Sequence, residues 1–121
     1  SGVVVNPNVK NPAAEVRRLG RKAENGGRYA LSQPVFSETE AREFLVQAQV
    51  VPLPILLGLL PFKNKAALAS MGTVPGIGVP KNLIDQVDDL PDSAVEDFSL
   101  DYCLSLAKSL RPLVAGFHVE Y

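Results

Sequence analysis

Three short apolar segments, each followed by a proline, recur along the chain at an even spacing. They end at Asn6, at Gln33 and at about Leu60, so 27 residues separate each end from the next. A strand, a connection and a helix that packs back on the sheet need roughly 30 residues. The spacing therefore predicts repeated βα units, which form a parallel sheet with right-handed crossovers.

The residues between these segments carry helix signals. Pro12 opens a run with apolar residues at helical spacing, and residues 25–27 (Asn-Gly-Gly) supply the left-handed stop. Ser37 and Glu40 form a capping box, in which each side chain satisfies a backbone N–H of the other residue, so a second helix is expected after Ser37. Each helix thus connects one predicted strand with the next.

The second half of the chain is richer in helix signals. Ser93 and Glu96 form a second capping box, which predicts the start of the longest helix, and Pro112 ends that helix. The strands expected from the whole chain span residues 3–5, 28–32, 55–60 and 114–119, and short helices are expected at 64–71 and around 83–87. The chain therefore holds four βα units.

The composition is typical of one folded domain, residues 1–121. Hydrophobic residues make up 46%, and 12 Lys and Arg face 13 Asp and Glu, so the net charge of -1 favours neither a nucleic acid nor a membrane as partner. The longest apolar run, residues 50–62, holds three prolines and is shorter than the roughly 20 residues that cross a bilayer. We expect a cytoplasmic protein.

Few side chains can carry catalysis or bind a metal. Cys103 is the only cysteine and His118 the only histidine, so neither a disulfide nor a Cys- or His-based metal cage can form within one chain. Both residues are interpreted as structural, although an acid/base role for His118 stays open. The carboxylates of residues 85–92 lack the alternate spacing of a calcium loop. No metal site is expected.

Four units leave two architectures open: a self-contained open sheet, or half of a barrel that needs eight units and about 250 residues. In either case ligands bind beyond the carboxyl ends of the strands. The candidates there are Asn6, Lys10, Gln33, Phe36, Pro61 and Phe62. Gln33 offers both donors and acceptors to a ligand, or alternatively ties down a loop.

The helix after Pro12 carries four basic residues at helical spacing, Arg17, Arg18, Arg21 and Lys22. Such a patch can bind a diphosphate, or it can simply be a solvated helix face. The sequence Gly76-Ile77-Gly78 is not a dinucleotide fingerprint, because Lys81 stands where the third glycine is required.

Short motifs along the chain follow the order and spacing found in one enzyme family. They are Asn6-Pro7, Arg21-Lys22 with Gly26-Gly27, Ser32-Gln33-Pro34-Val35-Phe36, Pro54 with Gly58 and Pro61, and Val74-Pro75-Gly76-Ile77 with Pro80. Over about residues 3–119 this order resembles the methylenetetrahydrofolate reductase family. The Ser-Gln-Pro-Val-Phe and Val-Pro-Gly-Ile versions are nearest to the bacterial form that is fused to a homocysteine S-methyltransferase domain.

The resemblance implies an α/β fold in which parallel βα units form the second half, strands five to eight, of a (β/α)8 TIM barrel. Family members are oxidoreductases that pass a hydride from NAD(P)H to FAD and then to 5,10-methylenetetrahydrofolate. The product, 5-methyltetrahydrofolate, serves methionine biosynthesis in one-carbon metabolism. The resemblance thus implies FAD as cofactor and a folate and NAD(P)H as substrates.

The resemblance also assigns roles to individual residues. Gln33 matches the glutamine that hydrogen-bonds the folate pterin. The positions that match contacts to FAD are Asn6, Lys10, Glu15, Arg18, Arg21 and Lys22. Arg21 and Lys22 match basic residues near the diphosphate, whereas Glu15 and Arg18 stand where the family has other residue types.

The chain also departs from the family pattern. The family's catalytic acid and the aspartate that tunes the flavin lie on strands that would precede residue 1, so no catalytic residue is expected in this chain. No aromatic residue replaces the one that stacks on folate, since the helix after Pro61 offers only Leu68 and Met71. We expect a homo-oligomer or pairing with an N-terminal half-barrel. The alternative is a non-catalytic α/β binding module that has lost the flavin.

Overall fold

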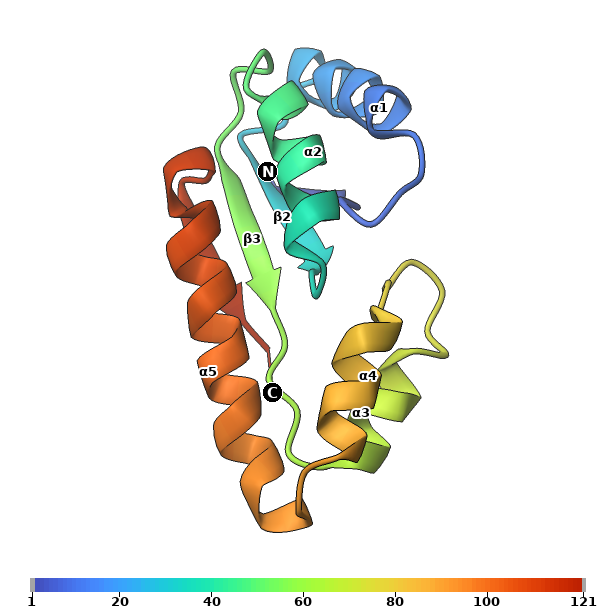
Figure 1. Ribbon diagram of the computed structural model, residues 1–121. Coiled ribbons are helices and arrows are strands. Elements are labelled where there is room, and N and C mark those ends of the chain that lie inside the picture. The colour runs from blue at the N-terminus through green and yellow to red at the C-terminus, as the bar shows by residue number, and fades with distance from the viewer. Residues whose placement is uncertain (1, 121) are drawn as a thin grey trace.

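The computed structural model describes residues 2–120, and the apolar segments form four parallel strands within them (Figure 1). The strands are β1 (Gly2–Val5), β2 (Tyr29–Pro34), β3 (Ile55–Leu59) and β4 (Gly116–Val119). They lie in the sheet in the order β1-β2-β3-β4, and every neighbouring pair is parallel. The consecutive order is that of a barrel segment rather than a doubly wound sheet, whose strand order reverses.

Helices connect the strands in the predicted sequence. They are α1 (Pro12–Glu24), α2 (Glu38–Ala48), α3 (Lys65–Met71), α4 (Lys81–Asp88) and α5 (Asp92–Leu110), and a 3-10 turn, Arg111–Leu113, follows α5. The predicted stop of α1 is confirmed, because Gly26 has a φ of 97°. The fold is therefore α/β and built of βα units, as part of a TIM barrel requires.

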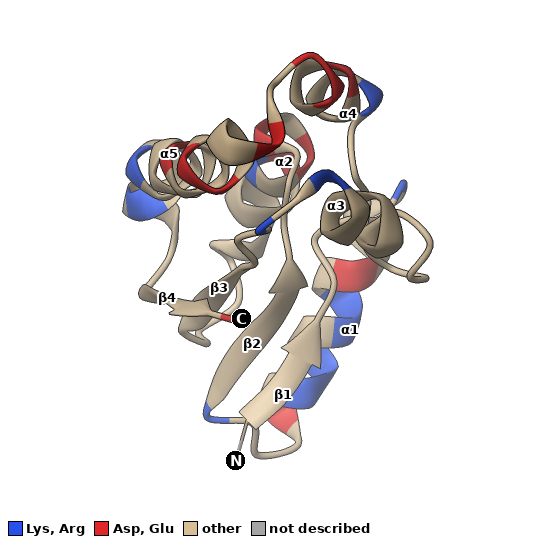
Figure 2. Ribbon diagram, turned by 90° about the horizontal axis from the view of Figure 1, so that it is seen from below, with Lys and Arg blue, Asp and Glu red and all other residues tan. Residues whose placement is uncertain are grey.

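One face of the sheet is covered by helices. In Figure 2 the helices α1, α2 and α5 lie along the same side of the four strands. The row of paired residues Val3, Ala30 and Ile55 belongs to the apolar core between these layers. A second apolar cluster fills the space between α3, α4 and the first turns of α5, beyond the carboxyl end of β3 (Figure 1).

The other face of the sheet carries no layer among the described residues. Val4 pairs with Leu31, and Leu31 pairs with Leu56, so these three side chains share the face opposite to the core. Val4 is 55% exposed, which is unusual for a valine in a strand. In a closed barrel this face is the packed interior.

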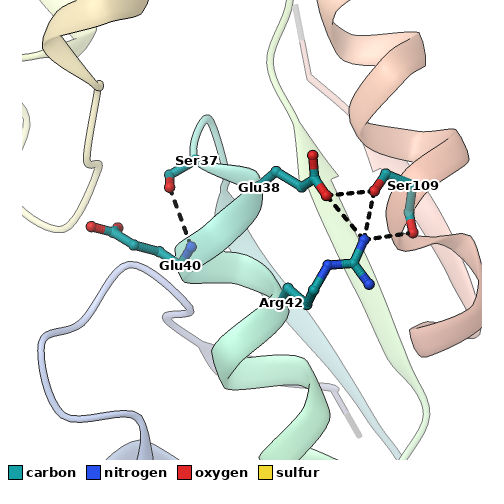
Figure 3. A network of polar contacts seen from close by, with 5 residues as sticks. All are labelled: Ser37, Glu38, Glu40, Arg42 and Ser109. Atoms are coloured by element: carbon teal, nitrogen blue, oxygen red, sulfur yellow. Dashed lines mark hydrogen bonds and ion pairs between the residues drawn. The ribbon is translucent and has the colours of Figure 1, made fainter.

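The helix layer is held together by a polar network as well as by apolar packing (Figure 3). Glu38 accepts a hydrogen bond from the Ser109 hydroxyl at 2.7 Å and pairs with Arg42 at 3.0 Å. The Arg42 guanidinium also donates to the Ser109 hydroxyl at 2.6 Å. Because Ser109 lies near the end of α5, this network ties α2 to α5.

The first predicted capping box is confirmed in part. The Ser37 hydroxyl accepts the backbone N–H of Glu40 at 3.2 Å, as expected for the first residue of the box. The Glu40 side chain, however, points away from Ser37 (Figure 3). A methyl group added at Gly78 would lie 3.6 Å from its carboxylate, so Glu40 faces the loop before α4 instead.

The second predicted capping box is wrong. α5 begins at Asp92, its N-cap is Pro91, and no side chain caps it. Pro91 has a φ of -67° and a ψ of 148°, so the extended residue that precedes the helix lies two positions before Ser93. Ser93 already belongs to the first turn, and its hydroxyl therefore cannot occupy the N-cap position.

None of the helices within residues 2–120 has the length and apolar character of a membrane-spanning segment.

Candidate functional site

The carboxyl end of β1 is joined to α1 by a buried carboxylate. Glu15 is 8% exposed, and its Oε2 accepts the backbone N–H of Asn6 at 2.9 Å. Its other oxygen lies 3.6 Å from the Arg18 guanidinium, which is 63% exposed. The structure thus brings together three of the residues that were assigned to FAD, namely Asn6, Glu15 and Arg18.

The basic residues of α1 are held in different ways. Lys22 donates from Nζ to the carbonyl oxygen of Val4 at 2.6 Å, and so fastens the end of α1 to β1. The side chains of Arg17 and Arg21 are exposed. Figure 2 shows that the basic residues follow α1 along the sheet. α1 therefore presents three exposed guanidinium groups, one of which pairs with Glu15, and one ammonium group that is bonded to the backbone of β1.

Lys10 lies in the loop between β1 and α1 and is exposed. Asn11, the next residue, is the N-cap of α1, and its side-chain oxygen accepts the N–H of Ala14 at 3.3 Å. The loop that carries Lys10 is therefore fixed at one end by Glu15 and at the other by this cap. It lies at the carboxyl edge of the sheet, where the strand order predicts ligand binding.

Gln33 lies on β2 at the same edge and is half-buried. The β2–β3 ladder is regular up to Leu31, which pairs with Leu56, but the next pair is Pro34 with Gly58. Between these pairs β2 has one residue more than β3, which defines a β-bulge. Gln33 is therefore one of the two residues that form the bulge.

Asn8 connects the strand ends, and the sequence reasoning missed it. Its Nδ2 donates to the Pro34 carbonyl at 2.8 Å and to the Gly76 carbonyl at 3.2 Å, and its backbone N–H donates to Asn6 Oδ1. Its own Oδ1 is buried without a hydrogen-bond partner among the described residues. The Asn-Pro-Asn sequence is a signal for such a turn, since Asn side chains bond the backbone two residues on.

Phe36 and Phe62, two of the aromatic candidates at the strand ends, belong to the second apolar cluster. Phe36 is 0% and Phe62 1% exposed, and their ring centroids are 6.4 Å apart. The Tyr102 hydroxyl donates to the carbonyl oxygen of Phe36 and holds this loop on α5. Leu68, which was considered at the place of the folate-stacking aromatic, is buried in the same cluster. These three side chains therefore pack in the core and are not accessible to a ligand.

The described residues contain no group of three or more His, Cys, Asp or Glu side chains that could hold a metal ion. Cys103 is buried in the core, where loss of solvent raises the pKa of its thiol. Its interpretation as a packing residue is confirmed. The polar groups described at this edge of the sheet are side-chain amides, guanidinium and ammonium groups and one buried carboxylate.

Two comparisons with known proteins give different results. A search of curated proteins finds no match to the chain. The family model described as methylenetetrahydrofolate reductase matches residues 4–120, which is nearly the whole chain. This chain belongs to the methylenetetrahydrofolate reductase family.

Proposed function

We propose that the chain forms the second half, strands five to eight, of the barrel of a flavin-dependent methylenetetrahydrofolate reductase. The observation that carries this proposal is the family match over residues 4–120. The position of Gln33 and of the Asn6–Glu15–Arg18 cluster at one carboxyl edge supports it, because barrel enzymes bind their substrates there.

The side chains of α1 suit the diphosphate of FAD. Arg18 and Arg21 are exposed, and a guanidinium group forms paired hydrogen bonds to phosphate oxygens. The Lys22 ammonium has three donor hydrogens, and the bond to Val4 uses one of them. Lys22 can therefore hold α1 on β1 and still contact a phosphate. We assign Asn6 and Lys10 to the loop that flanks the flavin.

The buried carboxylate has a supporting role in this proposal. Glu15 neutralises part of the charge of Arg18 and orients the backbone of Asn6. FAD, when bound, supplies the group that takes a hydride from NAD(P)H and passes it to 5,10-methylenetetrahydrofolate. The residues of this chain bind and orient that cofactor.

Gln33 is proposed to bind the pterin ring of the folate. Its side-chain amide has two donor hydrogens and a carbonyl oxygen, which match the mixed donors and acceptors of a pterin edge. Gln33 is half-buried, so it is not fully covered by the protein and remains accessible to a ligand. We propose no catalytic residue in this chain, and the proton donor has to come from the other half of the barrel.

The two edge strands of the sheet, β1 and β4, support the proposal that another polypeptide pairs with this chain. Within residues 2–120, β1 pairs only with β2 and β4 pairs only with β3. Unpaired edges with apolar side chains favour pairing with another chain. We propose that a second copy or an N-terminal half-barrel covers them, and that the assembled enzyme works in the cytoplasm.

One observation favours the alternative, a binding module without flavin. Glu15 and Lys22 both bond to backbone groups of the same chain, so their roles in the fold are independent of a cofactor. A visible absorption spectrum followed by an FAD titration of the full chain separates the two functions. Saturable binding with a flavin spectrum is expected from the reductase, and no affinity at high FAD would favour the module.

A further inference from the structure

The bulge in β2 is closed by a side chain instead of by the backbone. The N–H of Gly58 donates to the hydroxyl oxygen of Ser32 at 2.7 Å. The same hydroxyl donates its hydrogen to the carbonyl oxygen of Gln33 at 2.8 Å. Ser32 is 3% exposed, so this hydroxyl is a buried link that replaces a missing bond of the ladder.

A third strand contributes to the same point. His118 on β4 pairs with Gly58 on β3, and its ring reaches across this glycine to β2. His118 Nε2 lies 3.1 Å from the carbonyl oxygen of Ser32. A carbonyl oxygen can only accept, so Nε2 carries the hydrogen in this contact. Its Nδ1 lies 3.6 Å from a carboxylate oxygen of Glu120.

Gly58 is what allows this contact. A methyl group at Gly58 would lie 2.7 Å from the carbonyl oxygen of Ser32 and 3.0 Å from His118 Nε2. The first distance is shorter than real Cβ contacts and the second is tighter than most of them, so a side chain at Gly58 would force the Ser32 backbone or the His118 ring to shift. Because Gly58 has no side chain, the imidazole ring of His118 can lie over β3 and reach the backbone of β2.

The two carbonyl groups on either side of Gln33 Cα are therefore both held by side-chain donors. The carbonyl of Ser32 accepts from His118, and the carbonyl of Gln33 accepts from Ser32. Residues of a bulge lack regular ladder bonds, and their backbone direction depends on such contacts. With both peptide groups fixed, the direction in which the Gln33 side chain leaves the strand is fixed as well.

We propose that His118 is a positioning residue for Gln33: it crosses Gly58 to hold the bulge in the orientation in which the Gln33 amide meets its ligand. His118 does not touch the ligand in this arrangement and acts through the Ser32–Gln33 backbone. The ligand itself, a pterin, rests on the proposed function, whereas the effect of His118 on the backbone of Gln33 does not.

The test compares His118→Leu with His118→Gln in the full chain. The Gln side-chain amide can place a donor near the position of Nε2, whereas Leu retains the bulk without a donor. The matched control is Gln49→Leu, because Gln49 donates to the carbonyl of Leu113 at 3.0 Å, a bond between elements that does not reach the bulge. Solution NMR then measures hydrogen exchange of the Gly58 amide and the shifts of the Gln33 side-chain amide.

We expect His118→Leu to speed exchange at Gly58 by about three- to tenfold, the effect of one lost hydrogen bond, and to shift the Gln33 amide signals. His118→Gln should return exchange to within about twofold of the original rate, and Gln49→Leu should leave both signals unchanged. Unaltered Gly58 and Gln33 signals in His118→Leu would overturn the proposal. So would a failure of His118→Gln to restore them while that variant remains folded.

A second measurement tests whether the orientation of the Gln33 backbone affects ligand binding. It measures the affinity of each variant for folic acid. His118→Leu should weaken folic acid binding about three- to tenfold in the original chain and have no effect when Gln33 is already Ala. An equal effect with and without Gln33 would overturn the positioning role. If the original chain does not bind folic acid but the exchange results are as expected, the role of His118 stands and the proposed function of Gln33 fails.

Discussion

Glu15 and Asn6 are joined by a hydrogen bond of 2.9 Å from the backbone N–H of Asn6 to the Glu15 carboxylate. Nine residues separate them in the sequence, and the bond spans the loop from the end of β1 to the first turn of α1. This bond fixes the first turn of α1 to the end of β1, and the bond from Lys22 to the carbonyl oxygen of Val4 fixes the last turn, so both help to position the cations of α1.

Glu15→Ala should lower the free energy of unfolding by about 1–3 kcal/mol, since it leaves the Asn6 N–H without its partner. Glu15→Gln keeps an acceptor oxygen and should lose less. Glu43→Ala is the control, because Glu43 is exposed on α2 and should change the value by less than about 0.5 kcal/mol. Urea denaturation measures all three, and equal stability of Glu15→Ala and Glu43→Ala would show that the bond is dispensable.

Gly58→Ala and Gly20→Ala should have opposite effects on stability. The new methyl group at Gly58 would lie 2.7 Å from a backbone oxygen, and overpacking of this kind costs about 1–3 kcal/mol. At Gly20, inside α1, nothing lies within 4 Å of the methyl group, and the higher helix propensity of Ala should stabilise the protein by about 0.5–1 kcal/mol. Thermal unfolding of both variants checks the signs, and a stabilised Gly58→Ala would contradict the geometry of the bulge.

Acid should weaken the contact between α2 and α5. The hydrogen bond from Ser109, and then the one from Arg42, hold the pKa of Glu38 below its ordinary value of 4.5. A carboxyl group with a lowered pKa stabilises the fold above its unfolded pKa, and this stabilisation disappears as the pH falls through the folded pKa. The contribution is small, because Glu38 is exposed to solvent.

The measurement is the urea midpoint at pH 7 and at pH 3, in the original chain and in Ser109→Ala. The loss of stability between the two pH values should be smaller in Ser109→Ala, in which the largest cause of the lowered pKa is absent. An identical loss in both proteins would show that the network of Figure 3 makes no contribution in solution.

The uncovered face of the sheet should mediate association. By sedimentation velocity the isolated chain should have a mass above the 13.0 kDa of one copy. Val4→Glu places a charge on that face and should reduce association, whereas Val50→Glu, at a residue that is 81% exposed outside the strands, should not. A strictly monomeric chain would contradict a homo-oligomer and leave an N-terminal half-barrel as the remaining partner.

Much of the fold could be predicted because its signals are local. Pro7, Pro34 and Pro61 lie at the ends of three strands or two residues after them, and the interval between them reflects the length of a βα unit. The helix stop at Gly26 and the cap at Ser37 also depend on near neighbours. The start of α5 was misplaced, because Pro91 determines the backbone there and overrides the capping pattern of Ser93.

The contacts of the candidate site could not be predicted, because they join residues far apart in the sequence. His118 and Ser32 are 86 residues apart, and Asn8 and Gly76 are 68 apart. Neither pair follows from periodicity or from a motif. The assignment of Gln33 depended on the family resemblance and on its place at a strand end, and both are independent of these contacts.

The most direct test of the account is the affinity of the full chain for FAD, measured with and without the cations of α1. The account predicts that Arg21→Ala/Lys22→Ala weakens FAD binding at least about tenfold, since two charge-assisted contacts to the diphosphate are lost. The control, Arg28→Ala/Lys63→Ala, removes two exposed cations outside α1 and should bind FAD as the original chain does. Equal FAD affinity in all three proteins, or none in the original chain, would contradict the claim that α1 holds the flavin diphosphate.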